Sequence, residues 1–94
     1  MKVGFLNGKR VITSNGQFLG AVEDTEVSVD EWRVTHLHVS LEKEISEGLH
    51  FDNPFLGSVK VQLPVSTVQV VGDVIVLNKS IEELKEMKEF KPQK

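Results

Sequence analysis

Three histidines are the residues of this chain whose type and spacing could support chemistry. His36 and His38 are two positions apart, so a β-strand would place both imidazoles on one face, at a spacing that can chelate a metal ion. His50 could supply a third ligand, which a small site usually requires. The alternative is that both imidazoles lie on the outer face of a strand beside Trp32 and Val34, and the sequence favours this second interpretation.

Side chains that could catalyse a reaction are present, but not in a typical arrangement. The pairs Glu23-Asp24 and Glu42/Glu44 could serve as general acid and base, although such carboxylates are more often solvated surface groups. The seven glycines form neither a GxGxxG motif nor a phosphate-binding loop, and no serine lies in a nucleophile elbow. We therefore predict a protein that is not an enzyme, with no catalytic residue and no cofactor.

Length and charge narrow the remaining classes. Ninety-four residues favour one domain, and the absence of cysteine excludes disulfides and thiolate metal sites. The net charge is -3, and lysines are interleaved with acids rather than gathered in a basic stripe, which argues against nucleic-acid binding. The apolar start is too short for a signal peptide, and no apolar run reaches the roughly 18 residues of a membrane span. We predict a cytoplasmic protein without direct membrane insertion.

Hydrophobic residues alternate with polar ones along most of the chain, which predicts a mainly β fold. Asn15-Gly16 favours a hairpin with a type I′ turn, and Gly72-Asp73 favours one with a type II′ turn. Gly20 inside a strand suggests a bend or bulge of the kind that a barrel needs at a corner. The predicted strands cover residues 8–13, 18–29, 33–41, 58–63, 68–71 and 74–77.

Two segments depart from this alternation. A short helical segment is predicted near 42–49, and the connection that follows it, with Phe55 and Leu56, is expected to fold over an open end or edge of the barrel. Ser80 and Glu83 have the spacing of a capping box, which predicts a C-terminal helix near 80–90. The whole chain, 1–94, is then one domain, with the barrel over about 3–78, the helix, and a short tail over 91–94.

Apolar and amphipathic side chains on the strand surfaces indicate binding rather than catalysis. Trp32, Val34 and the two histidines of the third strand are expected to share an outward face, and such side chains are enriched at protein interfaces. The alternative is that the 42–57 segment covers this face. Residues 74–77 are apolar on both faces, so the helix or a second chain must cover the outer one. The predicted interface residues are Trp32, Val34, His36, His38, Phe55, Leu56, Ile75 and Leu77.

Three stretches of the sequence resemble the PRC-barrel domain, in its stand-alone archaeal form. They are GKRVITSNGQFLGAVEDTEV, WRVTHLHV and LGSVKVQLPVSTVQVVGDVIVLNKSIEELKE, of which the LPVSTV–VGDVIVLNKS run is the most specific. The family is named for the H subunit of the photosynthetic reaction centre and includes the C-terminal domain of the ribosome maturation factor RimM. The resemblance implies a small, strongly bent, six-stranded antiparallel β-barrel that serves as a binding or assembly module, with no catalytic residues.

The resemblance also implies partners. Similar archaeal proteins include the CdpB cell-division adaptors, which are dimers that associate with SepF, the membrane anchor of the FtsZ ring. We therefore predict a non-enzymatic adaptor that forms a homodimer or pairs with a paralogous PRC-barrel protein, with a SepF-type division protein as a further partner. One alternative is a RimM-like factor in RNA processing or ribosome maturation, and another is a small metal-binding module that uses His36 and His38.

Overall fold

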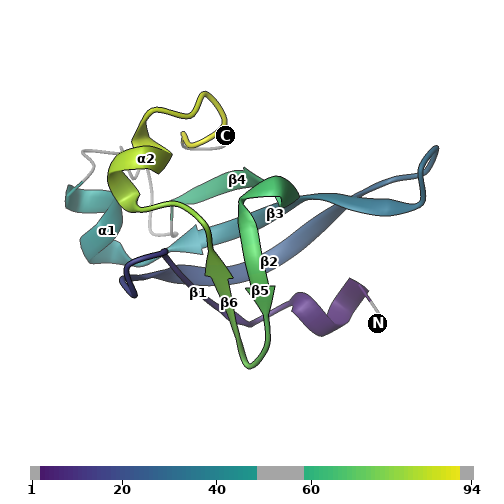
Figure 1. The fold of residues 1–94 in the computed structure, drawn as a ribbon, viewed down its shortest axis with the longest axis horizontal. Coiled ribbons are helices and arrows are strands. Elements are labelled where there is room, and N and C mark those ends of the chain that lie inside the picture. Colours follow the sequence, from purple (N-terminus) through teal and green to yellow (C-terminus); the bar gives the residue numbers. More distant parts are fainter. Residues whose placement is uncertain (1–2, 49–58, 92–94) are drawn as a thin grey trace.

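The computed structural model describes residues 3–48 and 59–91, which form one curved six-stranded β-sheet with short helices at its ends (Figure 1). The strands are β1 (Arg10–Ile12), β2 (Phe18–Ser28), β3 (Arg33–Leu41), β4 (Lys60–Pro64), β5 (Val68–Val71) and β6 (Val74–Leu77). The helices are α1 (Lys43–Gly48) and α2 (Ile81–Lys85), with single 3-10 turns η1 (Val3–Leu6) and η2 (Val65–Thr67). A mainly β fold with two short helices is therefore confirmed.

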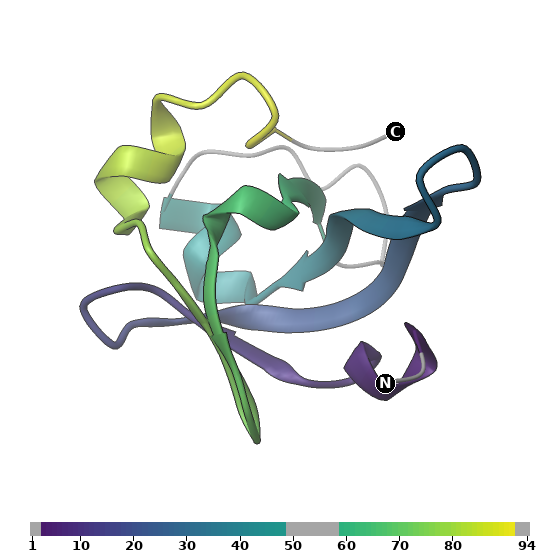
Figure 2. The ribbon, with the colours of Figure 1, turned by 45° about the vertical axis from the view of Figure 1, so that its right-hand side comes forward.

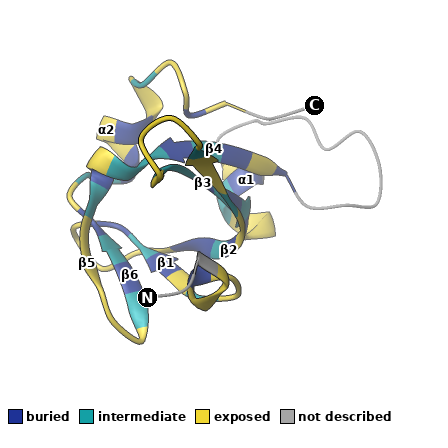
Figure 3. Ribbon diagram, turned by 90° about the vertical axis from the view of Figure 1, so that its right-hand side faces the viewer, coloured by how far each residue is buried: buried dark blue, intermediate teal, exposed yellow. Residues whose placement is uncertain are grey.

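The sheet is mixed, so the prediction of a wholly antiparallel barrel is wrong at one pairing. The strand order is β4-β3-β2-β1-β6-β5, and only β1 and β6 run parallel, from Arg10 opposite Val74 to Ile12 opposite Val76. The cause is the corner at Pro64 and η2, where the chain passes from β4 into β5 without reversing its direction. β4 and β5 are the two ends of the hydrogen-bonded order, and the sheet curls between them into an open barrel (Figure 3).

Alternate residues of the strands fill the inside of this barrel. A strand directs successive side chains to opposite faces, so one apolar set from each of β1, β2, β3, β4 and β6 points into the barrel, and Val68 of β5 packs against this core. Elements at the two ends add further side chains, including Ile81 and Leu84 of α2. The buried core consists of Leu6, Val11, Leu19, Val22, Leu37, Val39, Leu41, Val59, Val61, Leu63, Ile75, Leu77, Ile81, Leu84 and Phe90.

Gly20 of β2 lies against the backbone of β3, opposite Leu41. A Cβ atom at this position would be 2.1 Å from the backbone oxygen of Ser40, a distance that no side chain can occupy. The register of β2 against β1 shifts beside it, because Val11 faces Gly20 while Ile12 faces Phe18. Such an extra residue bends a strand and increases its twist. The predicted bend or bulge at Gly20 is therefore confirmed as an irregularity in the β1–β2 register.

Both predicted hairpins form, but their predicted turn types are wrong. At Asn15-Gly16 only the glycine has a positive φ, 85°, whereas a type I′ turn needs two such residues. The Thr13 amide donates to the Gln17 carbonyl, so the loop is longer than two residues. At Gly72-Asp73 the glycine φ lies outside the left-handed region that a type II′ turn requires. Figure 2 shows the β5–β6 hairpin extending past the rest of the barrel.

The capping box at the start of α2 is confirmed. The Glu83 amide donates to the Ser80 hydroxyl at 3.3 Å, and the Ser80 amide donates to a Glu83 carboxylate oxygen at 3.0 Å. The helix is shorter than the predicted 80–90, since it ends at Lys85. Turns follow it, and they bring Phe90 into the core, where its side chain is almost fully buried.

We expect Glu83→Gln to reduce the acid sensitivity of the fold. The hydrogen bond from the Ser80 amide, and then that from the Ser80 hydroxyl, hold the pKa of Glu83 below its ordinary value of 4.5. Because the folded-state pKa is the lower one, the carboxylate stabilises the fold above about pH 5 and loses this effect as the pH falls through the lowered pKa. Glutamine keeps the capping geometry without titrating.

Thermal unfolding of both proteins, followed by circular dichroism from neutral to acid pH, measures this difference. The wild-type midpoint should fall more steeply than that of Glu83→Gln over the acid range, by a few degrees at most, because Glu83 is exposed. Parallel pH profiles for the two proteins would show that the capping carboxylate has no role in acid stability.

Candidate functional site

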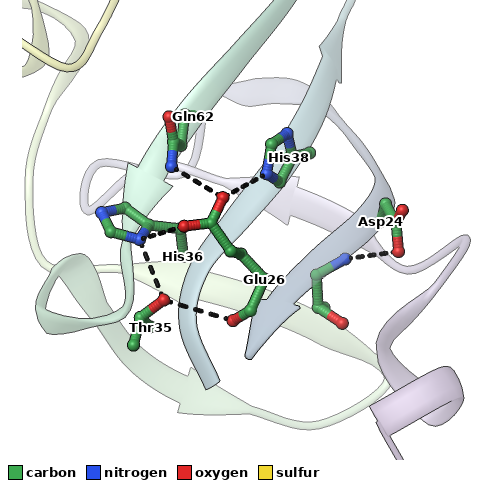
Figure 4. Close-up of polar contacts among 7 residues, drawn as sticks. Asp24, Glu26, Thr35, His36, His38 and Gln62 are labelled. Carbon is green, nitrogen blue, oxygen red and sulfur yellow. Dashed lines mark hydrogen bonds and ion pairs between the residues drawn. The ribbon is translucent and has the colours of Figure 1, made fainter. Parts of the chain in front are cut away.

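The two histidines of the predicted site lie on the outer face of β3, on either side of a carboxylate from β2 (Figure 4). Glu26 Oε1 is 3.3 Å from His38 Nε2, and Glu26 Oε2 is 3.6 Å from His36 Nδ1. Gln62 of β4 donates from its side-chain amide to Glu26 Oε1 at 3.2 Å. We call Glu26, His36, His38 and Gln62 the Glu26 cluster.

Strand register explains why these four residues meet. Glu26 of β2 pairs with His36 of β3, and His38 pairs with Gln62 of β4, so three neighbouring strands present polar side chains at one place. The Thr35 hydroxyl lies 3.0 Å from His36 Nδ1 and donates to the Glu26 backbone carbonyl at 3.3 Å. The cluster is therefore a surface hydrogen-bond network in which each imidazole has a polar partner.

A metal site would need at least three suitable ligands around one point. Within 3–48 and 59–91, no group of three or more histidine, cysteine, aspartate or glutamate side chains is placed to hold a metal ion. The predicted third ligand, His50, lies outside the described residues, as do Phe55 and Leu56. The contacts of the cluster that lie within the described residues are polar surface contacts.

Trp32 and Val34 do not share the face of the histidines, which corrects the sequence prediction. Trp32 precedes β3 and lies in the turn at the tip of the β2–β3 hairpin, with φ 54° and a side chain that is 81% exposed. Val34 is partly buried and contacts the core. The cause is an extra residue, Thr35: Val27 faces Val34 while Glu26 faces His36, so alternation along β3 is interrupted between them.

Ile75 and Leu77 are also misplaced by the sequence prediction, which put them at an interface. Both are fully buried in the barrel, with 0% of their surface exposed. The residues of β6 on the outer face are Val74 and Val76, which are partly exposed. β6 therefore has an apolar outer face, as predicted, but Val74 and Val76 form it instead of Ile75 and Leu77.

Sequence reasoning missed a row of apolar side chains that crosses the outer face of four strands. Phe18 of β2 faces Ile12 of β1, Ile12 faces Val76 of β6, and Val76 faces Val70 of β5. Phe18 is 38% exposed and Val70 51% exposed. We call these four residues the outer row. They come from distant parts of the chain, and the parallel β1–β6 pairing that aligns them has no local sequence signal.

An open hollow of about 330 Å³ adjoins the Phe18 end of the outer row. The lining residues from β2 and β3 are apolar or uncharged, and Glu42 and Lys43 at the start of α1 add two charged side chains. The lining residues are Phe18, Gly20, Ala21, Ser40, Leu41, Glu42 and Lys43. The hollow therefore continues the outer row along the surface toward β3.

Comparison with known proteins agrees with this architecture. A family model for the PRC-barrel domain matches residues 5–84, which is most of the chain. No curated protein shows a significant match. Among the helices of the described residues, none is long and apolar enough to span a membrane. That match is consistent with the curled six-stranded sheet and with the corner that the chain turns at Pro64 before the capped helix. The chain therefore belongs to the PRC-barrel family.

Proposed function

We propose that this protein is a non-enzymatic interaction and assembly module that forms a homodimer through the tip of its β2–β3 hairpin. Membership of the PRC-barrel family supports the general role. The resemblance to stand-alone archaeal members supports an adaptor in cell division, with a paralogous PRC-barrel protein or a SepF-type division protein as its further partner. The observation that carries the proposal is the exposure of Trp32.

Trp32 is unusual in both its side chain and its backbone. Tryptophan is among the residues most enriched where binding energy concentrates, and this one is 81% exposed in the isolated chain. It is also the one residue other than glycine with a positive φ in the described part of the chain. A bulky side chain in that region costs on the order of 1–3 kcal/mol, and such strain is concentrated at functional sites.

The surroundings of Trp32 suit a contact surface. Val29 in the same turn is 68% exposed, so two large apolar side chains lie on the tip. Glu31 and Arg33 form an ion pair beside them, which gives the apolar centre a charged rim. In Figure 1 the hairpin extends well beyond the sheet, so a second molecule can reach the tip without meeting the barrel.

Fluorescence can test this directly, because the chain has one tryptophan and no tyrosine. If the tip is the dimer interface, raising the protein concentration should move the emission to shorter wavelength as Trp32 leaves water. Sedimentation velocity should show dimers at the same concentrations. Trp32→Ala should raise the dimer dissociation constant roughly 30-fold or more, as expected for a central aromatic.

Phe5→Ala is the matched control, since Phe5 is an aromatic residue that is 57% exposed but lies on η1. Its dimerisation should equal that of the wild type. A protein that stays monomeric at every concentration would refute the dimer. A dimer whose emission does not change, and which Trp32→Ala leaves intact, would refute the tip as its interface. Titration with a purified SepF-type protein, read by the same emission, tests the division partner.

A further inference from the structure

We propose that the outer row, the hollow beside it and Arg10 form a second docking site, which binds an apolar peptide segment carrying an acidic side chain. This docking site is separate from the dimer contact proposed above, because it lies on the outer face of the barrel and not on the hairpin tip. It would give the module a surface for a different protein while the tip is occupied.

The outer row is a continuous apolar surface rather than a set of scattered residues. Each of its four members is the direct cross-strand neighbour of the next. Neighbouring strands lie about 4.8 Å apart, so the three intervals give a row of about 14 Å along the curved sheet. The row ends at β5, which is an edge strand whose residues 69–71 are all exposed. A partner can therefore place several apolar side chains along it.

Arg10 supplies the charge selectivity of this surface. It lies on the outer face of β1, two residues before Ile12 of the row. Its cross-strand neighbours are Ala21 on one side and Val74 on the other. Its guanidinium carbon is 5.8 Å from the centre of the Phe18 ring, so the cation is already held against the aromatic side chain. Among the described residues, no carboxylate forms an ion pair with it.

This charge pattern indicates the chemistry of the partner. An arginine fork binds a carboxylate in two parallel hydrogen bonds, and arginine beside an aromatic residue is a typical centre of binding energy. A second copy of this chain is a poor occupant, because the outer row that it would present has no acidic side chain to pair with Arg10. An acidic, apolar segment of another protein satisfies both features.

The hollow adds a place for one large side chain of that segment. Two of its lining residues connect it to the rest of the site: Phe18 belongs to the outer row, and Ala21 is the cross-strand partner of Arg10. A segment that pairs its carboxylate with Arg10 would therefore have one apolar side chain over the hollow and others along the row. The expected motif has an acidic residue close to apolar residues on both sides.

Selection from a phage-displayed library of random peptides tests the specificity. The wild-type protein should enrich peptides with an acidic residue among apolar ones, and Arg10→Glu should not retain them. One enriched peptide, labelled for fluorescence anisotropy, then measures affinity. Arg10→Glu should weaken its binding about a hundredfold, and Phe18→Ala roughly tenfold or more.

A charge exchange separates a direct ion pair from a structural effect. The same peptide with its acidic residue replaced by lysine should bind Arg10→Glu better than it binds the wild type. Lys85→Glu reverses an exposed charge on α2 and should leave binding unchanged. Trp32→Ala should also leave it unchanged, so loss of the dimer and loss of this site are distinguishable. No enrichment of acidic peptides, or equal binding by Arg10→Glu, would overturn the proposal.

Discussion

Gly20→Ala is expected to destabilise the domain by at least about 3 kcal/mol, more than most single methyl additions to a core. The added Cβ would lie 2.1 Å from the Ser40 oxygen, 2.9 Å from the Ser40 carbonyl carbon and 3.0 Å from the Leu41 Cα. All three are backbone atoms of β3, so no side-chain rotation can relieve the overlap. The two strands would have to separate. Leu19, next to Gly20, and Leu41, opposite it, would then lose their contacts in the core.

Urea denaturation followed by circular dichroism measures this effect. A stability of about 5–10 kcal/mol is ordinary for a domain of this kind, so the variant should unfold at a much lower urea concentration or be partly unfolded in buffer. Gly4→Ala is the control, because a Cβ added at Gly4 would have no atom within 4 Å and the residue has no positive φ. It should change stability by less than about 0.5 kcal/mol. Equal midpoints for both variants would mean that β2 and β3 do not approach so closely.

Local signals in the sequence were enough to locate most strands, the bend at Gly20 and the capping box at Ser80 and Glu83. Each depends on residues within a few positions of one another, such as an alternating strand or a serine three residues before a glutamate. The parallel pairing of β1 with β6 is different in kind. It joins Val11 to Ile75, which are far apart in the sequence. It depends on the direction in which the chain leaves the corner at Pro64, and no short segment of the sequence specifies that direction.

The candidate site likewise combines features that the sequence predicts with features that it does not. The shared face of His36 and His38 follows from their spacing on one strand, and the structure places both on the outside of β3. Glu26 and Gln62 join them only through strand register, which period-two alternation does not specify between strands. The placement of Val34 failed because the extra residue at Thr35 reverses the alternation, and one inserted residue exchanges the two faces.

Ile75→Asp should leave the protein unfolded, whereas Val76→Asp should leave it folded. Ile75 is fully buried, so aspartate there loses the packing of a large apolar side chain and places a carboxylate without a partner among Val11 and the rest of the core. Together these effects cost several kcal/mol, close to the whole stability of a small domain. Val76 is partly exposed on the outer row, where water can solvate the new charge.

Amide proton dispersion in a two-dimensional NMR spectrum distinguishes the two states, and peptide anisotropy adds a functional comparison. Folded Val76→Asp should lose binding of the acidic peptide, because a carboxylate in the outer row repels it and lies close to Arg10 through the β1–β6 pairing. If Val76→Asp also unfolds, the outer face of β6 must be covered by the chain itself and cannot be a docking site. If Ile75→Asp folds instead, the inner and outer faces of β6 are exchanged. Neighbouring residues of one strand thus test the barrel core and the proposed binding surface in a single pair of variants.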